Sequence, residues 1–374
     1  MLFRSFGIGA GVFFLGYFFF QVPANLILRE AGARRSVFWI LLVWGAVSAS
    51  TALVQGPLSF YALRFLLGVA EAGFFPGMVL YLTYWFPPSY RARYTAGFMT
   101  AVPLASIVGG PLSGLILKAD GLAGLHGWQW LFLIEGLPAC LLAFAALKFL
   151  PDGPEAVDWL TASEKQTIAD GLAADRAIAD TSLWPALIDP RVLALCLIAF
   201  GIGFGSYGIG LWLPQLLQGM GFSNLVIGLI VAMLYALGMA AMVIWGRSSD
   251  ARAERVWHVV MPSALAGAGL LAVSLIPSGP VALAALALTA IGLLAIDGPF
   301  FSLPSSFLGG AAVAGAIALI NAVGSLGAAA GPIVVGLLKD RSGSYAQSMA
   351  ALAAMLLAAA AVTALLGRRM SAKP

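Results

Sequence analysis

The chain has 374 residues, of which 61% are hydrophobic and 10% are charged, and its mean hydropathy is +0.96. This composition excludes a water-soluble domain with a single core and indicates a polytopic membrane protein that has the lipid bilayer as its surroundings. The formal net charge of +4 comes from lysines and arginines in short loops, so nucleic acid is not an expected partner. Cys140 and Cys196 lie in apolar segments, and their number and spacing predict neither a disulfide nor a metal site.

Eleven apolar runs are long enough to cross a bilayer, which takes about 20 residues. We therefore predict an all-α membrane protein with an amino-terminal bundle of five helices in 1–150 and a carboxyl-terminal bundle of six in 191–374. A polar cytoplasmic loop, 151–190, separates them and contains a short helix after Thr161, where Thr161 and Glu164 match a capping box. The predicted spans lie near residues 7–28, 37–55, 57–85, 93–117, 129–149, 191–217, 225–245, 257–276, 280–304, 311–338 and 345–367.

The positive charges predict the orientation of these spans. If the loop after the first span is cytoplasmic, fifteen of the 20 lysines and arginines lie on that side, and the amino terminus is outside. Arg4 precedes the first apolar run and three arginines follow it, which argues against a cleaved signal peptide. The first span is therefore expected to stay in the protein.

Two ionisable residues, Arg64 and Glu71, lie seven positions apart inside the apolar run from Pro57 to Phe86. A helix turns about 100° per residue, so this spacing puts both side chains on one stripe of a helix, with Gly68 between them. Charged groups at this depth must face a polar interior, which favours a lining of a substrate pathway. The alternative is a buried ion pair that only fixes helix packing.

The two halves of the chain are related by an offset of 221 residues. Arg29 and Asp250 lie at matching places in two basic turns, and Pro111 and Pro332 lie in two Gly-Pro breaks inside spans. Two unrelated features with one offset indicate an internal repeat. The repeat leaves the span 191–217 without a partner after Met1, so we expect a first helix to be encoded upstream; a natural eleven-span protein is the alternative.

A repeat of helical bundles with a polar central loop and two basic turns resembles the major facilitator superfamily. Five short sequence motifs are similar to those of its anion:cation symporter family, which includes tartrate, phthalate and sugar-acid permeases. The first half departs from the superfamily pattern because Arg29 stands where an acidic residue is usual, whereas Asp250 keeps the acid in the second half. The motifs are RFLLGVAEAGFFPG (64–77), YWFPPSYRAR (84–93), GWQWLFLIEGLP (127–138), LWLPQ (211–215) and ALINAVG (318–324).

The resemblance implies a monomeric proton-coupled transporter of the bacterial inner membrane, without a cofactor, that moves a small organic anion such as tartrate or a sugar acid by alternating access. Arg64 matches the family's membrane arginine and can hold a carboxylate through two hydrogen bonds. Glu71 matches its coupling carboxylate, and Asp297 is a second candidate for proton coupling. Further candidate ligands are Asn321, Tyr17, Tyr207 and Ser302, each of which could instead serve helix packing or bond its own backbone.

The two basic turns and the Gly-Pro positions are expected to control the conformational change. These candidate gating residues are Arg29, Gly32, Arg34, Arg35, Gly246, Asp250, Arg252, Pro111 and Pro332.

Two other classes of function compete with transport. A membrane-embedded enzyme would need a nucleophile near a histidine or a metal cluster, but His126 and His258 both lie close to membrane ends and no HExxH motif occurs. A transporter without its first helix could instead work only as a sensor, or have lost activity. No Gly-Lys-Ser/Thr phosphate loop is present, so ATP-driven transport by this chain is not expected.

Overall fold

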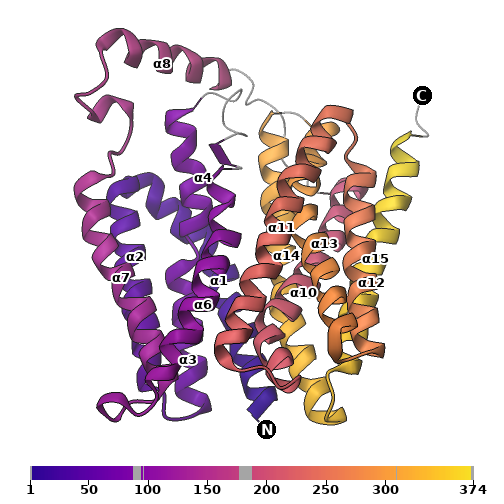
Figure 1. Ribbon diagram of the computed structural model, residues 1–374. Coiled ribbons are helices and arrows are strands. Elements are labelled where there is room, and N and C mark those ends of the chain that lie inside the picture. Colours follow the sequence, from indigo (N-terminus) through magenta and orange to yellow (C-terminus); the bar gives the residue numbers. More distant parts are fainter. Residues whose placement is uncertain (1, 87–93, 96, 177–187, 309, 372–374) are drawn as a thin grey trace. The chain divides into compact units, whose positions relative to one another are not determined.

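The computed structural model describes residues 2–86, 94–95, 97–176, 188–308 and 310–371, and every regular element in these residues is a helix (Figure 1). In the described residues ten stretches are long and apolar enough to cross a membrane, and a shorter apolar stretch, Ser5–Gln21, lies in α1 (Leu2–Ala31). The prediction of an all-α membrane protein is therefore confirmed. Residues 87–93 of the motif YWFPPSYRAR lie outside the described residues.

The helices form two compact units, which we describe separately. The amino-terminal unit comprises 12–99 and 116–180, and the carboxyl-terminal unit comprises 1–11, 100–115 and 181–374. The predicted functional division at residues 150 and 190 stays a prediction.

Besides α1, which contributes to both, the amino-terminal unit contains α2 (Ala33–Ser50), α3 (Pro57–Glu71), α4 (Phe74–Trp85), α7 (Gly127–Phe149) and α8 (Ala162–Arg176). The carboxyl-terminal unit contains α6 (Ala101–Ile116), α10 (Pro190–Gly219), α11 (Asn224–Arg252), α12 (Val256–Leu275), α13 (Gly279–Ser302), α14 (Gly310–Ser342) and α15 (Ala346–Ser371).

Local sequence signals fix where the helices begin. Pro190 occupies the first turn of α10, and the Asp189 carboxylate before it accepts a hydrogen bond from the backbone N–H of Arg191 at 2.7 Å. The predicted capping box of α8 is confirmed. The Thr161 N–H donates to Glu164 Oε2 at 2.8 Å, and the Glu164 N–H donates to Thr161 Oγ1 at 3.3 Å.

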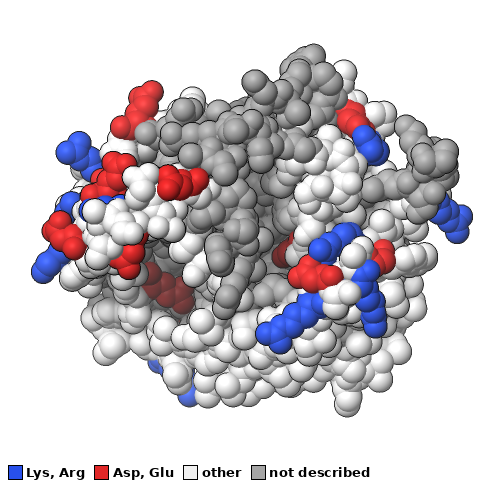
Figure 2. Space-filling model, turned by 90° about the horizontal axis from the view of Figure 1, so that it is seen from above, with Lys and Arg blue, Asp and Glu red and all other residues white. Residues whose placement is uncertain are grey.

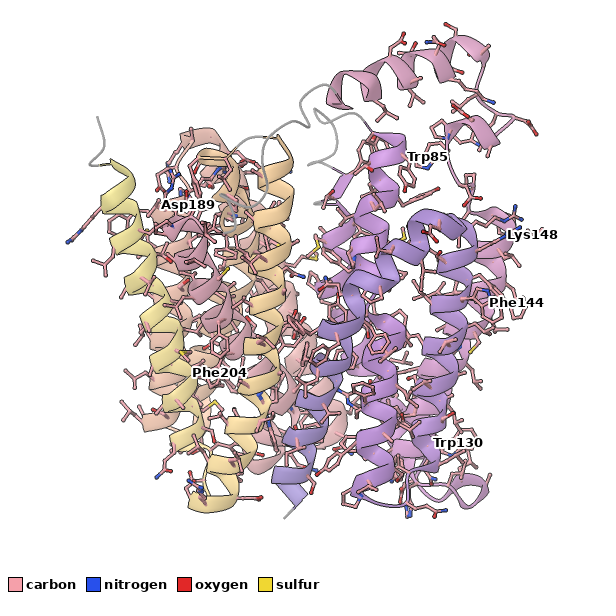
Figure 3. All side chains as sticks on the ribbon, turned by 180° about the vertical axis from the view of Figure 1, so that it is seen from behind. Trp85, Trp130, Phe144, Lys148, Asp189 and Phe204 are labelled. Carbon is pink, nitrogen blue, oxygen red and sulfur yellow. The ribbon has the colours of Figure 1, made fainter. Side chains whose placement is uncertain are left out.

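Within the amino-terminal unit, α2 packs along α7, and α8 lies across one end of the unit (Figure 1). Trp130 lies toward the opposite end of α7 from Lys148, and Lys148 is at the same end as Trp85 (Figure 3). Charged side chains are visible around the face that carries α8 (Figure 2). Both acidic and basic side chains are among them, and the assignment of this face to the cytoplasm stays a prediction.

The helix positions follow the predicted repeat. When the bounds of α2 are moved by 221 residues they overlap α12, and those of α7 fall within α15. The same shift carries α1 onto α11 to within one residue at its start. Among the helices that the structure describes, none is related to α10 by this shift. An internal duplication therefore accounts for the order and lengths of most helices.

The structure corrects the expectation of breaks at the Gly-Pro positions. Helix α6 continues through Pro111, α14 through Pro332 and α13 through Pro299. A proline removes one intrahelical hydrogen bond, and packing of neighbouring helices can maintain the helix around it.

Glycines let helix backbones approach closely in the carboxyl-terminal unit, where α10 packs most extensively on α14. A Cβ on Gly203 would overlap the carbonyl oxygen of Gly324, and one on Gly327 would overlap that of Phe200. Between apolar helices in a bilayer, such close approach is a main source of packing energy. The α10–α14 contact therefore depends on the absence of side chains at these positions.

We expect Gly327→Ala to destabilise the protein by about 1–3 kcal/mol, the usual cost of overpacking. Thermal unfolding of the purified protein in detergent measures this change. Gly109→Ala in α6 is the matched control, because a Cβ there meets no atom within 4 Å. Equal melting temperatures for the two variants would contradict the close-approach argument.

Candidate functional site

The predicted span 57–85 is divided into α3 and α4 directly after Glu71. Pro76 has no N–H to donate, and its ring excludes the Ala72 carbonyl from a regular helical hydrogen bond. Helix α3 therefore ends at Glu71, and the first bond of α4 runs from the Gly77 N–H to the Gly73 carbonyl at 3.0 Å. Glu71, whose carboxylate is predicted to couple protons, is thus the last residue of α3 and lies at a break in the span.

Arg64 lies in the middle of α3 and faces α1. Its guanidinium carbon is 5.1 Å from the ring centroid of Phe13, a cation–π contact. A Cβ on Gly68 would overlap the Phe13 carbonyl oxygen, so this glycine brings α3 against α1 beside Arg64. The buried Arg64 Nε has no hydrogen-bond partner among the described residues. An unpaired, charged donor in apolar surroundings is costly, which makes it a strong candidate to bind an anion.

Arg64 and Glu71 interact electrostatically along α3. Within the described part of the chain, however, no ion pair joins the two side chains. The two described side chains thus interact electrostatically without forming a close ion pair, and their roles as anion ligand and proton site stay a prediction.

The other candidate ligands lie in both units. Tyr17 in α1 stacks on Phe13, with ring centroids 6.2 Å apart, and so belongs to the same region as Arg64. Tyr207 in α10 is 48% exposed, and Asn321 is half-buried in α14. The Ser302 hydroxyl donates to the Gly298 carbonyl of its own helix at 2.9 Å. The structure groups Arg64, Glu71 and Tyr17, and it places Tyr207, Asn321, Ser302 and Asp297 in the carboxyl-terminal unit.

The first basic turn contains an acidic partner from a distant part of the sequence. Gly32 has φ +84°, in the left-handed region that favours glycine, and it is the residue directly before α2. Asp152, which follows α7, accepts a hydrogen bond from the Arg34 N–H at 2.9 Å. The Arg34 Nε donates to the Leu147 carbonyl, and the Tyr81 hydroxyl donates to the Pro151 carbonyl at 2.9 Å.

Asp152 was not among the residues predicted for this turn. Its carboxylate lies at the amino-terminal end of α2, where a negative charge is favourable. The turn therefore has an acid although Arg29 stands at the expected acidic position. The Arg29 side chain lies outside the described side chains, and Arg35 is exposed on α2.

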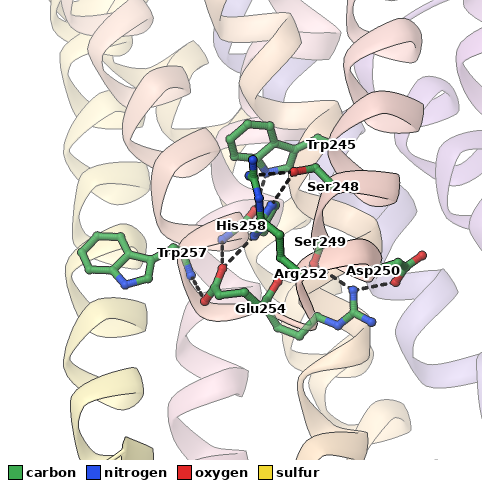
Figure 4. Close-up of polar contacts among 9 residues, drawn as sticks. Trp245, Ser248, Ser249, Asp250, Arg252, Glu254, Trp257 and His258 are labelled. Atoms are coloured by element: carbon green, nitrogen blue, oxygen red, sulfur yellow. Dashed lines mark hydrogen bonds and ion pairs between the residues drawn. The ribbon is translucent and has the colours of Figure 1, made fainter.

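The second basic turn, between α11 and α12, forms a polar cluster (Figure 4). Asp250 Oδ1 pairs with Arg255 Nη1 at 2.6 Å, and the same Nη1 donates to Ser249 Oγ at 2.8 Å. Arg252 Nη1 donates to Ser248 Oγ at 2.9 Å. The predicted gating residues Asp250 and Arg252 are therefore held by close partners, while Gly246 lies one turn earlier in α11.

Five members of this cluster were not among the predicted gating residues: Ser248, Ser249, Glu254, Arg255 and His258. A signal was present for two of them, since Glu254 lies four residues before His258 at the edge of an apolar span, a spacing that can bring two side chains together at the start of a helix. His258 Nδ1 is indeed 2.7 Å from Glu254 Oε2.

Comparison with known proteins agrees with this fold. The sequence profile of the Major Facilitator Superfamily matches residues 3–332. A protein of Agrobacterium vitis named "Putative tartrate transporter" is 46% identical over 97% of this chain and 84% of its own length. A "Quinolone resistance transporter" of Acinetobacter baumannii is 42% identical over 94% of this chain and 82% of its own. The crystal structure of a bacterial homologue of the lysosomal transporter Spinster has a TM-score of 0.79 at 16% identity, covering 98% of this chain and 89% of that one.

These matches define a multi-pass membrane transporter with two helical bundles rather than an enzyme. The chain belongs to the Major Facilitator Superfamily.

Asp152→Asn should destabilise the first turn by about 1 kcal/mol, because it removes the charge that caps α2. Proteolysis of the purified protein between α7 and α8 should then become faster. Asp158→Asn, which changes an exposed acid in the same segment, is the control and should behave like the wild type. If both variants resist protease equally, the cap contributes nothing measurable.

Proposed function

We propose that this protein is a secondary active transporter that takes up a small organic anion together with protons, by alternating access in a bacterial inner membrane. The substrate class proposed is a hydroxy dicarboxylate such as tartrate, or a sugar acid. The observation that carries the proposal is the buried guanidinium of Arg64, whose Nε has no partner among the described residues. A planar guanidinium binds a carboxylate through two parallel hydrogen bonds, which a neutral solute would not match.

The chemistry of Glu71 supports the proton-coupled part of the proposal. Its carboxyl is half-buried at the end of α3, seven residues from Arg64. A carboxyl in such a place can alternate between neutral and charged forms as water or a cation approaches. Bound anion and bound proton would then influence each other reciprocally through α3.

The relative named for quinolone resistance supports a second candidate function, export of a drug-like molecule. The same residues could serve either direction of transport. Purified protein in liposomes tests both, with radiolabelled tartrate, a sugar acid and a quinolone as probes under an imposed proton gradient. Tartrate or sugar-acid accumulation that collapses with a protonophore is the expected result. Movement of the quinolone alone would favour the second function.

Replacing Arg64 with lysine should weaken tartrate binding by roughly 10- to 100-fold, because lysine cannot form the two-point contact and one charged hydrogen bond contributes about 1.5–3 kcal/mol. Binding to the purified protein by calorimetry measures the loss. Arg341→Lys, at an exposed position near the end of α14, is the matched control. Wild-type affinity in Arg64→Lys would remove this residue from the binding site.

Glu71→Gln should retain exchange of labelled for unlabelled tartrate but lose accumulation driven by a proton gradient. Glutamine resembles the protonated acid and cannot release a proton. Counterflow and proton-driven uptake in the same liposomes separate the two activities. Glu135→Gln, on α7, is the control and should keep both. If Glu71→Gln still accumulates tartrate, the coupling carboxylate is elsewhere, and Asp297 is the next residue to test.

A further inference from the structure

The turn between α11 and α12 holds together two helices that otherwise contact each other little. Helix α11 packs on α13, and α12 packs on α13 and α15. The α11–α12 turn itself contains Ala253 in the left-handed conformation, with φ +50°. Trp245 Nε1 donates to the His258 carbonyl at 2.9 Å, which is one direct bond from α11 to α12. Polar side chains of the turn must supply most of the remaining connection.

Four of these side chains form a continuous series from a cation to an anion (Figure 4). Arg252 Nη1 lies 2.9 Å from Ser248 Oγ, and Ser248 Oγ lies 3.1 Å from His258 Nε2. His258 Nδ1 lies 2.7 Å from Glu254 Oε2. The His258 side chain is only 6% exposed, so its ring is largely shielded from water, whereas the contact between Arg252 and Ser248 is exposed.

The donors and acceptors in this series determine the state of the imidazole. Burial alone would raise the pKa of Glu254, but hydrogen bonds from Trp257 and His258 outweigh it and keep the pKa below its ordinary value. The two backbone N–H groups donate to this carboxylate at 2.7 and 3.1 Å. A carboxylate only accepts, so the proton between Glu254 and His258 must be on Nδ1. Ser248 already accepts from Arg252 and has its own hydroxyl proton to donate to Nε2.

We propose that His258 is a positioning residue for Arg252. Protonated on Nδ1, it is oriented by Glu254, and its Nε2 orients the Ser248 hydroxyl, which then holds the Arg252 guanidinium on the surface of α11.

Other charged groups surround this series on the packed elements. Asp250 and Arg255 pair with each other in the same turn, and Asp189 and Arg191 pair at the start of α10. Asp297 lies on α13, and Arg368 is exposed near the end of α15. Among the described residues, Glu254 is the acid that bonds the His258 ring, which makes it the group that selects the tautomer.

Nitrogen-15 NMR of the full chain labelled on histidine tests the proposal without any substrate. The sequence contains two histidines, and His126, with a side chain 71% exposed, is an internal reference whose signal is identified by His126→Gln. We expect His258 Nδ1 to carry a proton and Nε2 to accept a hydrogen bond. A His258 signal from the tautomer protonated on Nε2 alone would overturn the proposal.

Variants test the link from His258 to Arg252. Ser248→Ala should shift the His258 Nε2 resonance downfield, because that nitrogen loses a hydrogen-bond donor, and Arg252→Gln should shift it in the same direction by less. Trp245→Phe is the matched control: it removes a bond between the same helices but should leave the tautomer and the Nε2 resonance unchanged. An unchanged Nε2 resonance in Ser248→Ala would show that the series does not exist in the folded protein.

The effect on transport rests on the proposed function. We expect tartrate exchange to be roughly fivefold slower in His258→Gln than in the wild type, the scale of one hydrogen bond. Equal exchange rates in the two proteins would contradict a positioning role. Absence of exchange by the wild type would contradict the proposed function, and the NMR result would then decide the proposal alone.

Discussion

Close approach of helix backbones at glycine is the contact on which both units depend. In the carboxyl-terminal unit Gly203 and Gly327 bring α10 against α14, and in the amino-terminal unit Gly68 brings α3 against α1. A bilayer gives apolar helices no hydrophobic reason to associate with one another, so van der Waals contact between closely fitted surfaces must supply the energy. The large share of glycine and alanine in these helices is therefore a condition for the fold.

The same contact makes the site at Arg64 possible. Because Gly68 has no side chain, Phe13 can lie 5.1 Å from the guanidinium, and its ring partly compensates the charge. The compensation is incomplete, since Nε has no hydrogen-bond partner among the described residues. Such a cation suits a transporter. If all N–H groups of Arg64 were already hydrogen-bonded within the protein, binding an anion would gain little free energy.

The two basic turns use different means to place an acid beside their arginines. In the second turn Asp250 belongs to the turn and pairs with Arg255. In the first turn the acid is Asp152, more than 100 residues from Arg34, and it binds the backbone of α2 rather than a side chain of the repeat. The two halves have thus kept similar helices while their turns have diverged. Asp152 ties the segment after α7 to α2, and the Pro151 carbonyl beside it accepts from Tyr81 of α4.

The sequence by itself determined the class of protein, most helix positions, the repeat and the pairing of Arg64 with Glu71 on one helix. These follow from hydropathy and from helical periodicity, which act over a few residues and can be read locally. It could not determine that Asp152 caps α2 or that Phe13 lies over Arg64, because both contacts join segments far apart in the chain. The spacing of Glu254 and His258 indicated their contact, but it did not show that Ser248 joins them in one series, since the left-handed residue Ala253 and the packing of α12 decide which side chains meet. Local periodicity was enough to find the helices, and only tertiary packing decided which polar groups on them acquired partners.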